Sequence, residues 1–174
     1  ENNVNVRELR ERVVGRKSSR ITPKMFEYSL VEKAASSKQR IVLPEGSGER
    51  VLRATDILLR RGVADITLLG PVDTILHKAS GLGLDISDAQ VIDPVQSDMF
   101  EGYKAEYMEL RKHKGVTKDI AHDRMSDPTY FGTMMVHTGR CDGMVAGATH
   151  STAMTIRPAF QVIKVKRGYS LVSS

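Results

Sequence analysis

The 174-residue sequence lacks several features that would indicate particular classes of protein. It has one cysteine, Cys141, which excludes an internal disulfide and makes the reducing cytoplasm the expected compartment. No apolar run approaches the length of a membrane span. Internal repeats and low-complexity tracts are also missing. The length and the mixture of charges then favour one soluble globular domain with a proper core.

Common patterns for metal binding, nucleotide binding and nucleophilic catalysis are missing as well. The five histidines show no ligand spacing beside a carboxylate, so we predict no metal site. No nucleophile elbow or Ser/His/Asp set is present. The loop at 46–48 resembles the start of a dinucleotide fingerprint, but Val51 occupies the third glycine position. Because Glu45 and Glu49 would repel a pyrophosphate, we interpret this loop as a strand-to-helix turn.

Positive charge is unevenly distributed along the chain. The net charge is +5, and the first 24 residues alone carry seven basic and three acidic side chains. Such a segment could contact nucleic acid, but it has no interleaved aromatics and no recognised nucleic-acid module. We therefore expect residues 1–20 to be a basic linker from a preceding region.

Short apolar runs alternate with segments of helical periodicity in the rest of the chain. Strands are predicted at 41–43, 65–70, 91–94, 144–146 and, at the end, 170–172. Helices are predicted between them, the first beginning at Thr22-Pro23 with Phe26, Leu30 and Ala34 at helical spacing. This alternation predicts an α/β fold with a mostly parallel sheet and helices on both faces.

Polar side chains gather directly after the strand at 144–146. Hydroxyl residues there can cap a helix whose free N–H groups bind anions, and Arg157 would add a fork that fits phosphate or carboxylate. His150 is a ligand donor, a base or a hydrogen-bonded loop residue. Arg111, in a basic cluster that closes a long helix, is a clamp for a phosphorylated ligand or a complement to the helix dipole. Spacing does not choose between these alternatives.

Five collinear segments across residues 20–174 together resemble the phosphate acetyltransferase (phosphotransacetylase) family. They are Arg20 to Tyr28 (RITPKMFEY), Ile41 to Glu45 (IVLPE), Leu110 to Gly115 (LRKHKG), Tyr130 to His137 (YFGTMMVH) and Asp142 to Pro158 (DGMVAGATHSTAMTIRP). Five matches in order are far more specific than any one of them.

The resemblance implies an enzyme that interconverts acetyl-CoA plus phosphate with CoA plus acetyl phosphate. It implies two α/β domains of the isocitrate dehydrogenase type, with the first at 21–167 and the start of the second at 168–174. Coenzyme A would be a substrate, no cofactor would be needed, and the protein would form homodimers or larger assemblies. The implied substrate-binding residues are Arg111, His150, Ser151, Thr152, Thr155 and Arg157.

The resemblance also places the catalytic aspartate and a Ser-Arg pair beyond Ser174, so the chain is expected to be an inactive fragment of a larger protein. The family often has Ser where Thr152 stands, which keeps the hydroxyl and adds a methyl group. Two alternatives stay open: a non-catalytic metabolite-sensing domain of the kind found as tails on malic enzymes, and a phosphate butyryltransferase.

Overall fold

The sheet of this protein has four parallel strands. The structure is a computed structural model that describes residues 21–165 and 168. The strands are β1 (Gln39–Leu43), β2 (Ala64–Leu69), β3 (Gln90–Ile92) and β4 (Gly143–Met144), in the spatial order β3-β2-β1-β4. All three neighbouring pairs are parallel. The predicted α/β fold is therefore confirmed.

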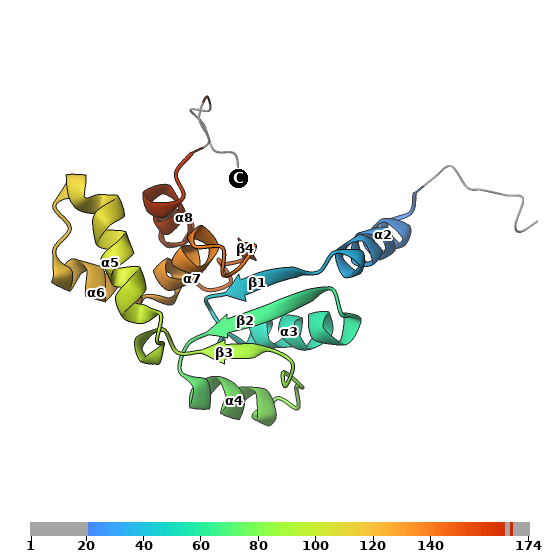
Figure 1. The fold of residues 1–174 in the computed structure, drawn as a ribbon. Helices are drawn as coiled ribbons and strands as arrows, with labels where there is room; N and C mark the ends of the chain where they lie inside the picture. Colours follow the sequence, from blue (N-terminus) through green and yellow to red (C-terminus); the bar gives the residue numbers. More distant parts are fainter. Residues whose placement is uncertain (1–20, 166–167, 169–174) are drawn as a thin grey trace, which may run out of the picture.

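Helices cover both faces of the sheet, as Figure 1 shows. On one face α3 (Glu49–Arg61) and α4 (Val72–Gly81) pack over an aliphatic core that includes Leu52, Leu68 and Ile75. The other face carries a core rich in Phe, Tyr and Met. The helices around this second core are α5 (Phe100–Arg111), α6 (Lys118–Ser126), α7 (Pro128–His137) and α8 (Thr152–Val162). Parallel strands buried on both faces explain why β1 and β2 read as nearly continuous apolar runs.

Local sequence signals set many of the helix ends. The side chains of Thr22, Thr117 and Asp127 accept hydrogen bonds from backbone N–H groups at the starts of α2, α6 and α7. Gly62 ends α3 in the left-handed conformation, with φ of 61°. Short 3₁₀ turns, η1 (Pro94–Gln96) and η2 (Lys112–Lys114), flank α5. The predicted start of the first helix at Thr22-Pro23 is therefore confirmed.

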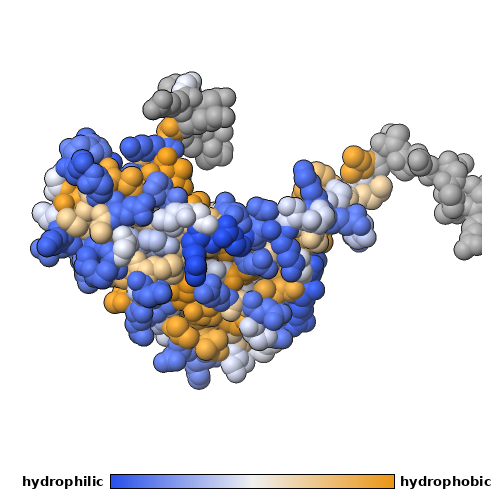
Figure 2. All heavy atoms as spheres, in the orientation of Figure 1, coloured by the Kyte–Doolittle hydropathy of each residue, from blue (hydrophilic) through white to orange (hydrophobic). Residues whose placement is uncertain are grey.

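Helix α2 (Pro23–Ser36) extends away from the sheet and has no buried residue. Phe26 and Leu30 are 56% and 51% exposed, and Figure 2 shows apolar residues on the outer part of this helix. Near the base of α2, an apolar groove of about 500 Å³ runs between α3 and the sheet and reaches Ala34, Ile41 and Val145. The helix was thus predicted correctly. The apolar side chains of Phe26 and Leu30 on it are not buried by any other part of residues 21–165 and 168.

The structure differs from some sequence predictions and leaves others outside the residues it describes. Strand β4 is shorter than the predicted 144–146, because the backbone leaves the ladder after Val145 donates to the Val42 carbonyl oxygen at 3.1 Å. The linker at 1–20, the strand at 170–172 and nearly all of the expected start of a second domain lie outside the described residues.

Candidate functional site

The candidate site lies at the carboxyl ends of β1 and β4. These strands are parallel neighbours, with Ile41 opposite Gly143 and Val42 opposite Met144. The turn after β1 therefore meets the loop after β4, although about a hundred residues separate them. Ligand sites of open parallel sheets form at this edge.

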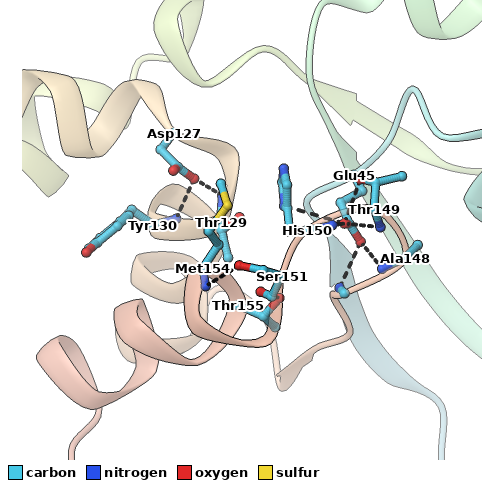
Figure 3. A network of polar contacts seen from close by, with 11 residues as sticks. Glu45, Asp127, Thr129, Tyr130, Ala148, Thr149, His150, Ser151, Met154 and Thr155 are labelled. Carbon is cyan, nitrogen blue, oxygen red and sulfur yellow. Dashed lines mark hydrogen bonds and ion pairs between the residues drawn. The ribbon is translucent and has the colours of Figure 1, made fainter.

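A carboxylate clasp joins the two segments, as Figure 3 shows. The Glu45 side chain is only 4% exposed. Its Oε2 accepts the backbone N–H groups of Gly147 (2.9 Å) and Ala148 (2.7 Å), and its Oε1 those of Thr149 (2.7 Å) and His150 (2.8 Å). The Thr149 hydroxyl donates a fifth bond to Oε1 at 2.8 Å. A loop whose successive N–H groups converge on one anion is a backbone nest.

The clasp keeps Glu45 ionised despite its burial. Burial by itself raises the pKa of this carboxyl, since it disfavours the charged form. The hydrogen bonds from Thr149, Ala148 and His150 outweigh burial and lower the pKa to about 2 from the ordinary value of 4.5. The predicted strand-to-helix turn after β1 is confirmed, since α3 begins at Glu49. The charge of Glu45 faces the protein's own amides, which was not predicted from the sequence.

The hydroxyl cluster forms the start of α8, as the sequence predicts. Ser151 is the N-cap, with its hydroxyl accepting the Met154 N–H at 3.4 Å. Thr155 donates its hydroxyl proton to the Ser151 carbonyl oxygen at 3.2 Å. Thr152 is exposed at the first helical position. The His150 imidazole is 31% exposed, and its Nδ1 lies 3.4 Å from Glu45 Oε1 without hydrogen-bond geometry.

Beyond the first turn of α8, two tyrosines share one amide. Tyr107 of α5 and Tyr130 of α7 have ring centroids 5.9 Å apart. Their hydroxyls donate to the same Gln161 Oε1, at 2.8 Å and 3.0 Å. Both rings are almost fully buried. The shared acceptor ties α8 to the two helices beneath it.

The charges of three guanidinium groups act on this tyrosine pair. Burial raises the pKa of Tyr107, and the charges of Arg124 and Arg111 partly offset that effect. Burial likewise raises the pKa of Tyr130, opposed by Arg124 and Arg157. Arg124 also stacks on the Tyr130 ring, with Cζ 4.9 Å from its centroid. Arg111 and Arg157 thus act on neighbouring tyrosines of one pair, and their roles as ligand-binding residues stay predictions.

Within the part of the chain that the structure describes, these three arginines form no ion pair. The Nε atom of Arg111 is buried there without a hydrogen-bond partner. Cations near one pair of buried rings with no carboxylate partner among the described residues suit an anionic ligand. A pocket of about 520 Å³ adjoins the clasp and is lined by Gly48, Glu49, Arg50, Arg53, Ala148 and Thr149.

Sequence reasoning missed Glu45 and Arg124 as members of the site. Arg124 stands in the last turn of α6, where a cation ordinarily complements the helix dipole. Its stacking on Tyr130 distinguishes Arg124 from a cation that only complements the helix dipole. This contact is visible in the fold and not in the sequence. Glu45 carried a weak hint, as a carboxylate placed where a buried strand ends.

Comparison with known proteins assigns the family. The family model described as phosphate acetyl/butaryl transferase matches residues 25–174. The chain belongs to this family. A phosphate acetyltransferase of Nitratidesulfovibrio vulgaris is 56% identical over 174 residues, which are all of this chain and 25% of the relative. One from Thermoanaerobacterium thermosaccharolyticum is 50% identical over 84% of this chain and 44% of its own length.

Solved structures agree with the family and the fold. A phosphotransacetylase from Streptococcus pyogenes superposes with a TM-score of 0.81 at 38% identity, covering 86% of this chain and 45% of that one. One from Staphylococcus aureus gives 0.75 at 39% identity, covering 82% and 43%. The chain thus spans less than half the length of these transferases, and the resemblance seen in the sequence is confirmed.

Among residues 21–165 and 168, no group of three or more His, Cys, Asp or Glu side chains could hold a metal ion. None of the helices in that same part is long and apolar enough to cross a membrane. Cys141 is buried, and burial raises the pKa of its thiol, as expected for a small core residue.

Proposed function

We propose that this chain is the N-terminal part of the catalytic region of a phosphate acetyltransferase, which transfers acetyl reversibly between coenzyme A and phosphate. The observation that carries the proposal is a set of three arginines, Arg111, Arg124 and Arg157, whose charges act on one buried tyrosine pair and which form no ion pair among the described residues, in a chain that belongs to this family. Both substrates are anions, and guanidinium groups bind phosphate with directed hydrogen bonds.

The chemistry needs two anions to approach one another. The coenzyme A thiol loses a proton, the thiolate attacks the carbonyl carbon of acetyl phosphate, and phosphate leaves as the C–O bond breaks; the reverse path forms acetyl phosphate. Arginines that hold both reactants lower their mutual repulsion and fix their orientation. We propose this role for Arg157 and Arg111, with Arg124 as a third cation.

The start of α8 would supply hydrogen bonds to the same ligand. His150 and the hydroxyls of Ser151, Thr152 and Thr155 are the hydrogen-bonding groups in this proposal, with the Thr155 hydroxyl turning from the Ser151 carbonyl oxygen to the ligand, at a helix N-terminus that favours negative charge. The base that deprotonates the thiol is proposed to lie outside residues 1–174. No resident cofactor or metal is part of the scheme, and we propose a cytoplasmic homodimer or larger assembly.

The test replaces Arg157 with Gln in a full-length polypeptide that carries this chain. Formation of acetyl phosphate from acetyl-CoA and phosphate is measured at subsaturating substrate. We expect kcat/KM to fall about tenfold or more, which is about 1.4 kcal/mol of transition-state stabilisation. Arg61→Gln is the matched control, because Arg61, like Arg157, is exposed. Its guanidinium pairs with Glu27 near the opposite end of the strands, away from the candidate site.

An unchanged kcat/KM in Arg157→Gln would contradict the proposed role. Activity of the 174-residue chain alone would show that the base lies within it. If the full-length polypeptide bound acetyl-CoA but transferred nothing, a metabolite-sensing domain would replace the enzyme as the interpretation. Butyryl-CoA tested in parallel determines the acyl preference.

A further inference from the structure

We propose that Glu45 is a positioning residue of the substrate site, because it fixes the loop 147–150 from which His150 and helix α8 project. The inference deepens the proposed function and rests on it for the identity of the substrate. It concerns a side chain whose contacts are all within the protein.

The loop has little support other than this carboxylate. Its four successive N–H groups, at 147–150, donate to Glu45, and the part of the chain described by the structure offers them no second acceptor. Gly147 adopts φ of 103°, a backbone conformation that would be strained for any residue with a side chain at this position. One side chain therefore holds a backbone conformation that neither strand nor helix stabilises.

Both carboxylate oxygens are needed for this clasp. Oε2 accepts two N–H groups, while Oε1 accepts two N–H groups and the hydroxyl of Thr149. A glutamine at position 45 would offer one oxygen and turn its NH₂ group toward the donors of the other side. The geometry thus requires an anion with two acceptor atoms.

The held loop is continuous with the residues proposed to bind substrate. His150 is its last residue, and Nδ1 of its ring lies 3.4 Å from Glu45 Oε1. Ser151, which caps α8, follows directly. A Cβ atom on Gly147 would lie 3.6 Å from the Thr155 hydroxyl oxygen, so the loop also packs on the first turn of α8. Movement of the loop would therefore displace all three side chains.

A purely structural carboxylate elsewhere on the same strands provides a matched control. Asp142 accepts the backbone N–H of Arg40 at 2.8 Å and its guanidinium at 3.0 Å and 2.7 Å. It joins the segments of β1 and β4 at their amino ends, away from the loop at 147–150. Its pKa is also lowered to about 2, chiefly by the hydrogen bond with the Arg40 side chain. Asp142→Asn therefore weakens a comparable tie without touching the site.

The experiment compares Glu45→Ala, Glu45→Gln and Asp142→Asn in the full-length polypeptide. Steady-state kinetics per folded molecule should show kcat/KM reduced about 10- to 100-fold in Glu45→Ala, as expected for a site displaced by about 1 Å, and unchanged in Asp142→Asn. Because Glu45→Ala leaves the nest empty, added formate should restore activity to it and to neither other protein. Glu45→Gln, which fills the nest with an amide, should resist rescue.

A second readout does not depend on catalysis. Amide hydrogen exchange should accelerate at 147–150 and the first turn of α8 in Glu45→Ala, and formate should slow it again. If the parent polypeptide transferred no acetyl group, the proposed function would fail, while exchange would still decide whether Glu45 holds the loop. Equal kinetic losses in Glu45→Ala and Asp142→Asn, or unchanged exchange at 147–150, would overturn the positioning role.

Discussion

Replacing Gln161 with leucine should reveal how strongly α8 is anchored to the helices beneath it. Oε1 of Gln161 is the acceptor for the hydroxyls of Tyr107 and Tyr130, whose residues are 2% and 3% exposed. Leucine fills similar space but accepts no hydrogen bond. A buried polar group left without a hydrogen-bond partner costs about 1–3 kcal/mol. Losing the hydrogen bonds of both tyrosine hydroxyls should therefore lower the free energy of unfolding by about 2–6 kcal/mol.

A double-mutant cycle isolates this cost. In a background where Tyr107 and Tyr130 are both phenylalanine, no hydroxyl is left to be orphaned, and Gln161→Leu should cost about 1 kcal/mol or less. Urea denaturation followed by circular dichroism measures each free energy. Gln96→Leu, an exposed change on η1, is the control and should stay within about 0.5 kcal/mol of the parent.

The same substitution should also affect the proposed substrate site. Arg157 lies one helical turn before Gln161 on α8, so both project from one face of the helix. We expect the KM for coenzyme A to rise in Gln161→Leu while the Gln96→Leu value stays unchanged. An equal loss of stability in the tyrosine and phenylalanine backgrounds would refute the account of the shared acceptor.

Two further predictions concern the turn after β1. The lowered pKa of Glu45 gives stability that is complete above pH 4.5 and is lost as the pH falls toward 2. The gap in unfolding free energy between the parent and Glu45→Gln, about 3 kcal/mol at neutral pH, should therefore close near pH 2 in urea titrations; a gap independent of pH would contradict this. A Cβ on Gly46 would lie 2.6 Å from the Leu69 carbonyl oxygen, so Gly46→Ala should destabilise by about 1–3 kcal/mol. Gly102→Ala in α5, where a Cβ meets nothing within 4 Å, should instead stabilise by about 0.5–1 kcal/mol, as thermal unfolding can check.

Local patterns in the sequence determined most of the secondary structure and the class of the fold. Apolar runs at 41–43 and 65–70, each followed by a helix with its own start and stop signals, were enough to predict parallel strands with covering helices. The collinear motifs also indicated the family correctly. These signals succeed because helix capping, glycine turns and apolar periodicity act over a few residues and are written directly in the chain.

Only the tertiary structure decided which residues contact one another at the candidate site. The sequence around Glu45 does not indicate that its partners are backbone amides more than a hundred residues away. Every residue except proline carries such an N–H group, so the sequence gives no sign of which ones will bind the carboxylate. Arg124 likewise looks like an ordinary last-turn cation until α7 brings Tyr130 beneath it. Sequence tells the charge and reach of a side chain, whereas the parallel pairing of β1 with β4 and the packing of α6 on α7 determine which charge it meets.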